Sequence, residues 1–595
     1  MLFKFAVSIA YATLPGAVVL PALADEIDFK NHLQHADVVL MPGWENQNVG
    51  NAAPLHPKIV AWGEDAVWGT AERKRNAQKY RAMGVNLIAA NVWMLTATKE
   101  KLAQSQALQD ASCRDIAGDK LIPPWLDDGQ SYWGCTNQAA FRAQLRQRVR
   151  DGMLAGANLL HLDDHLGTVA ATAHGGCFCD ACMEGFNHWL AQNISPAQLK
   201  ALGVRELVHF SYRDYLHDLG VKTRADYLAR QANLPLQQEY LQFQRAAIND
   251  FVQELKTLAE KNHGSYVPLG INAWNLVPSQ LANAHLADYF SNEIKHYGVE
   301  ASHPPFAYKL ADALGKPVFA TAAGEGWSHI NHRKQTQRVR QWLAMSYVFG
   351  HQFMYAFKQW AFDPERGTNW YEPTIEEYAP VTDFVTQHSD LFNDYEALAP
   401  VALLYNAVAE RSDEQPLRRY VEQWHRESLQ FRLLAAGDNV LKTRLKPGDI
   451  AGLAFVCRID NSELVNQQNA VFEAWQKAGK AGKCDALPQP ENYRIAVRDR
   501  NQKDLPGVWA LARVHNSRPP VVHLLNQNFD DRGAPQQPHS EITVALPSPL
   551  LGRVSAVHLH RPQRSSVTLN VLTTPQGPQV TVPELEYWAV LQLQR

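Results

Sequence analysis

The chain has 595 residues, more than a single hydrophobic core usually holds, and this length predicts two to four domains. Its 57 basic and 60 acidic residues nearly balance, which argues against a partner such as nucleic acid or a membrane surface, because both favour a basic excess. The 16 Trp and 20 Tyr are compatible with stacking on sugar rings, although hydrophobic cores use the same side chains.

The first 24 residues have the pattern of a cleaved secretory signal. Lys4 supplies an early positive charge, and residues 5–20 are mostly small and apolar. Ala22-Leu23-Ala24 then matches the small-x-small rule for signal peptidase, which makes Asp25 the expected mature start. No other apolar stretch is long enough to cross a bilayer. We therefore expect a periplasmic or secreted protein without membrane insertion.

Residues 25–398 alternate short apolar runs with amphipathic helical stretches, such as 139–154, 239–261 and 335–348. Near-continuous apolar runs are typical of parallel strands that are buried on both faces. Eight β-then-α units predict a (β/α)8 TIM barrel. A doubly wound open sheet is the alternative, but the chain has no glycine-rich nucleotide fingerprint. The eight expected strands are 38–42, 59–63, 85–92, 158–162, 267–273, 289–293, 318–322 and 352–357.

Two smaller domains are expected after the barrel. Residues 399–492 contain expected strands at 402–405 and 453–458 and expected helices at 417–435 and 463–478, the pattern of a flavodoxin-like α/β domain. Residues 493–595 contain short alternating strands, such as 521–525, 541–545, 554–559 and 587–593, separated by turn residues. This second pattern predicts a C-terminal β-sandwich.

Polar and aromatic residues follow nearly every expected barrel strand. A carboxylate at such a position is often only a helix N-cap, and a Trp is often packing at the barrel mouth. Carboxylates and aromatic rings together at nearly all strand ends instead indicate an acidic, Trp-lined site, because active residues of a barrel lie at the C-terminal ends of its strands. The side chains expected to contact substrate are Glu64, Trp93, His165, Asn272, Trp274, His296, Trp327, Lys358 and Trp360.

Enzymes that cleave glycosidic bonds need two carboxyl groups, one to protonate the leaving oxygen and one to act as nucleophile or base. Asp164 is the first candidate for one member, because it follows the fourth strand directly. Asp163 is its rival, since neighbours on a strand point in opposite directions. Glu293 is the preferred second member because it ends a strand. Glu325 is the alternative, because its two flanking glycines suit a loop close to a ligand.

The cysteines Cys177, Cys179 and Cys182 form a C-x-C-x-x-C motif with two interpretations. In one, the three thiols and a distant Cys135 or Cys113 bind a structural zinc ion. In the other, Cys113–Cys135 and Cys457–Cys484 are disulfides, and the motif holds one local bridge or none. A catalytic zinc site is not expected, and no cofactor is expected for catalysis.

The segment Leu162-Asp163-Asp164-His165-Leu166-Gly167, followed by the cysteine motif, resembles glycoside hydrolase family 42 β-galactosidases and related uncharacterised hydrolase-like proteins. In that family an Asn-Glu pair ends strand four, and a C-x-C-x-x-C loop binds structural zinc. The resemblance places Asp164 at the acid/base and Glu325 at the nucleophile, and it also implies a homo-oligomer. Asp-Asp replaces Asn-Glu here, however. An Asp that ends strand four resembles the nucleophile of α-fucosidase-like and α-galactosidase-like barrels, which would make Glu293 the acid/base.

Three functions are compatible with these patterns. The first is a glycoside hydrolase or transglycosylase that acts on an oligo- or polysaccharide. The second is a non-catalytic carbohydrate-binding protein on a degenerate barrel, since the Asp-Asp departure is compatible with lost catalysis. The third is a deacetylase or other metal hydrolase using His161, His165 and His296, which lack a metal-ligand motif.

Overall fold

The computed structural model describes residue 29 and residues 33–42, 52–63, 70–126, 129–204, 206–296, 304–407, 415–437, 441–459, 464, 468–528, 537–575 and 577–595. The expected secretory signal and Glu64 lie outside these ranges. Among the helices in these ranges, none is both long and apolar enough to span a membrane.

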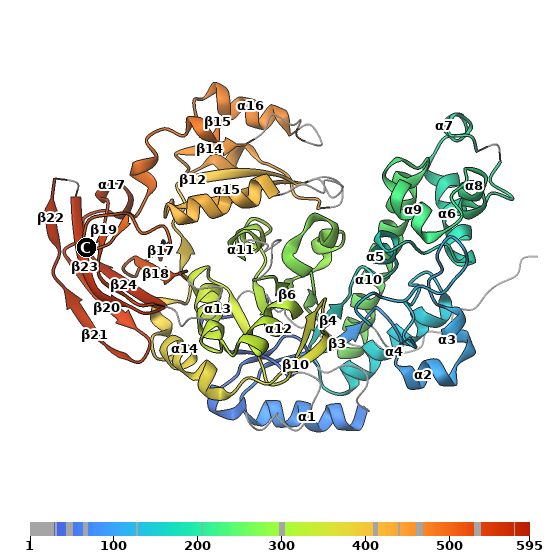
Figure 1. Ribbon diagram of the computed structural model, residues 1–595, viewed down its shortest axis with the longest axis horizontal. Coiled ribbons are helices and arrows are strands. Elements are labelled where there is room, and N and C mark those ends of the chain that lie inside the picture. Colours follow the sequence, from blue (N-terminus) through green and yellow to red (C-terminus); the bar gives the residue numbers. More distant parts are fainter. Residues whose placement is uncertain are drawn as a thin grey trace, which may run out of the picture.

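Eight parallel strands close into a barrel, which confirms the predicted (β/α)8 architecture (Figure 1). The last strand pairs with the first, with Val39 opposite Met354. All eight apolar runs of the sequence are strands of this barrel. They are β1 (Val39–Met41), β2 (Ile59–Val60), β3 (Leu87–Trp93), β4 (Leu159–Asp163), β5 (Leu269–Ile271), β6 (Tyr289–Ile294), β7 (Val318–Ala322) and β8 (Gln352–Ala356).

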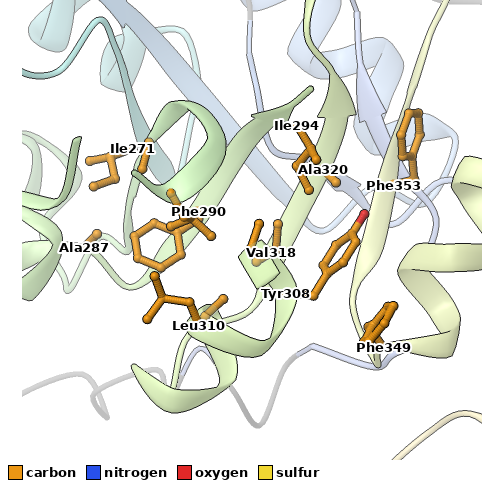
Figure 2. Close-up of a cluster of buried hydrophobic side chains, with 14 of the residues drawn as sticks. Ile271, Ala287, Phe290, Ile294, Tyr308, Leu310, Val318, Ala320, Phe349 and Phe353 are labelled. Atoms are coloured by element: carbon orange, nitrogen blue, oxygen red, sulfur yellow. The ribbon is translucent and has the colours of Figure 1, made fainter. Parts of the chain in front are cut away.

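The barrel strands are apolar throughout because both of their faces are buried. Inward-facing side chains such as Leu87, Leu159 and Tyr289 form one cluster inside the barrel. Outward-facing side chains pack on the surrounding helices, as Figure 2 shows for Phe290 and its neighbours against Tyr308 and Leu310. This alternation fixes which residues at the strand ends point into the barrel mouth.

Helices connect the barrel strands and cover their outer face. The expected helices at 139–154, 239–261 and 335–348 are confirmed within two residues at each end. The helices are α1 (Thr70–Ala82), α2 (Lys99–Gln104), α3 (Gln106–Asp110), α4 (Ala139–Leu154), α10 (Gln237–His263), α11 (Pro304–Ala313), α12 (Gly324–Arg333), α13 (Gln337–Val348) and α14 (Ile375–Gln387). A two-stranded hairpin, β9 (Gln359–Asp363) and β10 (Gly367–Tyr371), follows β8.

A helical insertion with its own core lies between β4 and α10. Its helices are α5 (Thr168–Ala173), α6 (Asp180–Asn193), α7 (Pro196–Ala201), α8 (Tyr212–Asp218) and α9 (Arg224–Arg230). Aromatic side chains such as Phe186 and Tyr212 and the cysteine motif form a core that is separate from the main one. The insertion and the C-terminal sheets lie at opposite ends of the molecule, with the barrel between them (Figure 1).

The second region is a four-stranded parallel sheet in the order β13-β12-β14-β15. This order, 2-1-3-4 along the chain, follows the flavodoxin-like arrangement. Its elements are β12 (Val401–Ala407), α15 (Gln415–Arg426), β13 (Phe431–Gly437), β14 (Phe455–Arg458), α16 (Asn469–Lys477) and β15 (Ala481–Lys483).

The expected helix at 417–435 is wrong in its second half. The helix ends at Arg426, and residues from Phe431 form strand β13 along β12. Ser428 between them has a φ of 53°, a left-handed conformation that breaks the helix. The apolar residues after it suit a buried strand as well as a helix, so periodicity did not separate the two.

The C-terminal region is a β-sandwich of a six-stranded and a four-stranded sheet around one apolar core. The first sheet contains β11 (Glu396–Ala397), β17 (Val508–Val514), β18 (Val521–Asn526), β20 (Ala556–Arg561), β21 (Arg564–Leu569) and β24 (Trp588–Gln594). The second contains β16 (Val497–Arg498), β19 (His539–Ala545), β22 (Leu572–Thr574) and β23 (Gly577–Leu585), and a short helix, α17 (Ser548–Leu551), follows β19. Strand β11 follows the barrel directly and pairs with β17, so it joins the barrel to the sandwich.

Candidate active site

The two aspartates at the end of β4 both reach the barrel mouth, by different routes. Asp163 has the same strand parity as the inward-facing Leu159 and therefore points inward. Asp164 is the first residue after the strand, and its φ of 49° takes the backbone out of the strand alternation. A non-glycine residue in this conformation is uncommon and is often found at functional sites.

Asp164 is held by the end of the neighbouring strand. The indole Nε1–H of Trp93 donates a hydrogen bond of 2.6 Å to Oδ2 of Asp164. Trp93 is the last residue of β3 and pairs in register with Asp163. The buried Arg148 of α4 donates hydrogen bonds to the backbone oxygens of Trp93 and Thr96, so the strand end that carries the indole is itself fixed.

Asn272 joins Asp163 to Glu293. Its Nδ2 lies 3.1 Å from Oδ1 of Asp163 and 3.3 Å from Oε2 of Glu293. Oδ1 of Asp163 also accepts the backbone N–H of Asp164 at 2.9 Å. Asn272 is the first residue after β5. Side chains at the ends of β4, β5 and β6 are therefore linked by hydrogen bonds at one point of the mouth.

Burial raises the pKa of two carboxyl groups at this point. The pKa of Asp164 rises to about 6 because of desolvation, which the hydrogen bond from Trp93 partly opposes. The pKa of Glu293 rises to about 7, again through desolvation, with further contributions from the negative charges of Asp164 and Glu325. Both side chains keep some solvent exposure, so they remain accessible from the mouth. Between about pH 6 and pH 7, Asp164 is therefore mostly ionised while Glu293 mostly retains its proton.

Glu325 lies in the first turn of α12, not in the glycine-rich loop that the sequence suggested. The N-terminus of a helix is a favourable place for a carboxylate. Its Oε1 is 3.8 Å from Nζ of Lys295, which follows β6. Glu325 therefore stands at the rim as an ion-paired neighbour of Glu293.

Two further predicted residues lie at the β9–β10 hairpin: Lys358 directly before β9, and Trp360 within it. Nζ of Lys358 lies 3.8 Å from Oε1 of Glu372 and 5.4 Å from the ring centre of Trp370. The ring of Trp360 packs so closely on Gly324 that a Cβ there would lie 2.5 Å from it. Trp274 is half-buried in the short 3-10 turn that follows β5.

Two predicted substrate-contacting residues belong to the core, so these predictions are corrected. Trp327 is completely buried, stacks on Tyr371 and donates a hydrogen bond to Thr321. Its place on α12 turns it toward the barrel wall instead of the mouth. His165 is also completely buried, with Nε2 2.9 Å from the backbone oxygen of Gln280.

The histidines of the metal-hydrolase interpretation have separate environments. His161 lies inside the barrel, with Nδ1 2.9 Å from Oδ1 of Asn91 and its ring 4.6 Å from that of Trp62. The half-buried His296 stacks on Trp342 with ring centres 4.6 Å apart. Burial lowers the pKa of His161 and of His296 to about 3 and that of His165 to about 4. Within the described residues the three do not form a group that could hold a metal ion.

Four cysteines do form such a group. The sulfurs of Cys135, Cys177, Cys179 and Cys182 all lie within 4.8 Å of one another and are buried. Tetrahedral zinc with four thiolates places its sulfurs about 3.8 Å apart, and Cys135 lies 3.6 Å from Cys179 and from Cys182. Hydrogen-bond donors also point at the sulfurs, among them the amide of Asn137 at 3.3 Å from Cys182. The donor set thus fits a zinc ion.

The disulfide prediction is half correct. Cys457 and Cys484 form the expected bridge in the α/β region. Cys113 and Cys135 are both free, because Cys135 belongs to the four-cysteine group. Cys113 faces the backbone oxygen of Gly134 at 3.7 Å.

Two features of the site region were not predicted from the sequence: the support that Arg148 gives to Trp93, and the aromatic surface of the β9–β10 hairpin. Arg148 sits in the middle of a predicted helix, where nothing in the local pattern marks it as buried. Trp370 and Phe362 follow the eighth strand by more than four residues, outside the strand ends at which substrate contacts were expected. The dense aromatic residues of segment 357–371 were the available signal.

The chain is similar in sequence to two known alpha-agarases. The chain is 23% identical over 496 residues to an alpha-agarase from Thalassotalea agarivorans, covering 78% of this chain and 33% of that protein. It is 22% identical over 494 residues to an alpha-agarase from Alteromonas agarilytica, covering 78% and 34%. The chain thus spans about a third of the length of these curated relatives.

The fold has a full-length match among solved structures. The alpha-L-fucosidase isoenzyme 2 from Paenibacillus thiaminolyticus superposes with a TM-score of 0.62 over 95% of this chain and 100% of that chain, at 13% identity. This likeness supports the order of barrel and C-terminal domains and bears on the fold alone. No protein-family model matches the chain, and the resemblance to family 42 is not confirmed.

Proposed function

We propose that this protein is a glycoside hydrolase that cleaves glycosidic bonds in an oligo- or polysaccharide, with Asp164 and Glu293 as its two carboxyl groups. One observation carries the proposal: Asp163, Asp164, Asn272 and Glu293 meet at the C-terminal mouth of a TIM barrel, linked through shared hydrogen bonds. The alignment with two alpha-agarases over most of this chain supports the same activity.

The two carboxyl groups have complementary roles in this reaction. Glu293, with its pKa near 7, holds a proton that it donates to the leaving glycosidic oxygen as the bond to the anomeric carbon breaks. Asp164 is ionised at the same pH, and its carboxylate either attacks the anomeric carbon or takes a proton from an attacking water. The indole N–H of Trp93 stabilises the charged form of Asp164.

Asp163 and Asn272 are positioning residues in this scheme. Asp163 accepts hydrogen bonds from the Asp164 backbone and from Asn272, and Asn272 in turn orients Glu293. Glu325 raises the pKa of Glu293 through its negative charge, which favours the proton-donating form.

Agar is the first substrate to test. The relatives are named for their action on agar, and each aligns with 78% of this chain. The proposed substrate class is therefore a galactan of the agar type, and a panel of other bacterial and plant glycans tests its limits.

The test compares variants on agarose and on a panel of oligosaccharides, with released reducing ends as the readout. Asp164→Asn and Glu293→Gln should each lower kcat by at least about a thousandfold, because each removes a group that acts in the transition state. Asp218→Asn, which alters an exposed carboxylate of the helical insertion, is the matched control. Equal activity of all three variants would remove the assignment.

The same experiment separates the carbohydrate-binding alternative. A wild-type protein that binds a glycan and releases no product from it would indicate a degenerate, non-catalytic barrel. If the wild-type protein neither binds nor cleaves any glycan of the panel, the result argues against both functions.

We also propose that Cys135, Cys177, Cys179 and Cys182 hold a structural zinc ion. The cluster joins the loop before α4 to the start of the helical insertion, so the metal would fix the insertion on the barrel. Zinc here would supply folding free energy and no chemistry to the reaction.

Export of the protein and its assembly into a homo-oligomer are proposed from the sequence alone. The N-terminal pattern supports a periplasmic or secreted protein, where polysaccharide substrates are accessible. A homo-oligomer is expected only from the family 42 resemblance, and a sedimentation measurement tests it.

A further inference from the structure

The hairpin formed by β9 and β10 has two unlike faces. The strands pair with Trp360 opposite Trp370 and Phe362 opposite Thr368, so these four side chains share one face. The other face carries Gln359, Ala361 and Tyr371, which are buried. The first face is the more exposed one, with Trp370 38% exposed.

The buried face anchors the hairpin to α12. Asn331 of α12 donates hydrogen bonds to Oδ1 of Asn369 at 3.2 Å and to the backbone oxygen of Trp370 at 3.0 Å. Asn369 donates to Ser328 of the same helix at 3.0 Å. Tyr371 stacks on the buried Trp327. A hairpin held at this many points presents its aromatic face in a fixed orientation, which lowers the entropy cost of binding a ligand.

The aromatic face contacts the first turn of α12, the helix that carries Glu325. Trp360 stacks on Phe362 with ring centres 5.8 Å apart, and the edge of its ring lies on Gly324. Gly324 directly precedes Glu325, whose charge acts on Glu293. A side chain at position 324 would collide with Trp360. Gly324 therefore permits the contact between the hairpin and the first turn of α12.

The charge on this face indicates the chemistry of its ligand. The ammonium group of Lys358 lies 5.4 Å from the ring centre of Trp370, and it is paired with the carboxylate of Glu372. The face therefore offers aromatic rings with a balanced charge beside them. Aromatic rings of this kind suit the apolar C–H face of an uncharged sugar ring better than a sulfated or carboxylated one.

We propose that Trp370, with Trp360 and Phe362, forms a sugar-binding platform that holds an uncharged polysaccharide chain beyond the bond to be cleaved. The inference rests on the proposed function for the identity of its ligand. It adds a subsite outside the carboxylate cluster, on an element that follows the eighth barrel strand.

Native electrophoresis in gels that contain agarose tests the binding directly, with sulfated carrageenan as the charged comparison polymer. The Asp164→Asn background prevents digestion of the polymer. Agarose should retard this protein, and adding Trp370→Ala should weaken the apparent affinity about tenfold. Trp370→Phe should restore most of the retardation, because it keeps an aromatic ring. Trp189→Ala, which removes a partly exposed Trp of the helical insertion, is the matched control and should migrate like the parent.

Kinetics provide an independent readout. In the otherwise wild-type enzyme, Trp370→Ala should lower the ratio of kcat/KM for agarose to kcat/KM for a short agar oligosaccharide about tenfold, mainly through KM. Trp189→Ala should leave that ratio unchanged. Thermal unfolding of each variant shows whether the hairpin is still folded.

The outcomes separate this proposal from the proposed function. Unchanged retardation and an unchanged ratio in a folded Trp370→Ala variant would overturn the platform and leave the hydrolase intact. Retardation by carrageenan alone would overturn the uncharged class of ligand. Retardation by agarose that depends on Trp370, without hydrolysis of any glycan by the wild-type protein, would support the platform and overturn the hydrolase.

Discussion

The indole N–H of Trp93 and Oδ2 of Asp164 lie 2.6 Å apart, across the ends of two neighbouring barrel strands. The bond favours the charged form of a carboxylate that burial otherwise disfavours. Desolvation is the larger effect, so the pKa of Asp164 stays near 6 while that of Glu293 lies near 7. The proposed site thus separates its two carboxyl groups into an ionised and a protonated member.

This separation predicts a bell-shaped dependence of kcat/KM on pH, with limbs near pH 6 and pH 7. Activity falls below the lower limb because Asp164 becomes protonated, and above the upper limb because Glu293 loses its proton. Trp93→Phe should shift the acidic limb to higher pH, because the charged form of Asp164 loses its donor. Trp189→Phe is the control, and an acidic limb at the same pH in both variants would contradict the assignment.

Glu325 should affect the alkaline limb of the pH profile. Its negative charge is one of the causes that raise the pKa of Glu293. Glu325→Gln should therefore lower the pKa of Glu293 and move the alkaline limb to lower pH, with kcat at the optimum reduced only a few-fold. Glu372→Gln, which removes the carboxylate paired with Lys358, should leave the limb in place. A loss of activity as complete as that of Glu293→Gln would instead make Glu325 a catalytic residue.

The raised pKa of Glu293 also predicts a pH-dependent effect on stability. A carboxyl group whose pKa is raised in the folded state does not change the free energy of unfolding below about pH 4.5, where it is protonated in the folded and the unfolded protein. It lowers the free energy of unfolding most above about pH 7, where it is ionised in both. Glu293→Gln should therefore raise the free energy of unfolding by about 3 kcal/mol at pH 8 and change it little at pH 4. Urea unfolding at the two pH values measures this difference, and an equal effect at both would argue against a charged, desolvated Glu293.

The barrel was predictable from the sequence because its strands are buried on both faces and are therefore apolar without interruption. The choice between Asp163 and Asp164 was not predictable from the sequence. The left-handed conformation of Asp164 brings both side chains to the mouth, and no local sequence pattern encodes this conformation. Trp327 was misplaced for a related reason: a Trp after a strand suits the mouth and the core equally well, and only the orientation of α12 decides. The helix predicted through residue 435 failed where apolar residues suited both a helix and strand β13.

The four-cysteine group predicts one equivalent of zinc per chain, measured by metal analysis of the purified protein. Cys179→Ser should abolish the bound metal and lower the melting temperature by several degrees, because the helical insertion loses its attachment to the barrel. Cys113→Ser is the matched control, since Cys113 is buried beside the group without belonging to it. A strong chelator should have the same effect on stability as Cys179→Ser, and a metal content that survives Cys179→Ser would contradict the ligand set.

The α/β region should contribute to the site through Arg418 of α15. This buried guanidinium lies 3.4 Å from the backbone oxygen of Asn275 and 4.2 Å from the ring centre of Phe306. Oδ1 of Asn275 accepts the backbone N–H of Lys295 at 3.1 Å. Lys295 in turn lies beside Glu325, so a residue of the second domain supports the rim of the barrel through three contacts.

Arg418→Ala should therefore lower kcat about tenfold, with a smaller change in KM, since the misplaced rim alters the environment of Glu293. Arg418→Lys should recover part of the activity, because it keeps a cation near Phe306. Arg419→Ala, at the exposed neighbouring position, is the control and should behave like the wild type. A shift of the alkaline limb in Arg418→Ala distinguishes positioning from a loss of folded protein, which would scale activity equally at every pH. If Arg418→Ala matches Arg419→Ala in both kcat and pH profile, the two domains are joined at this point without any effect on the site.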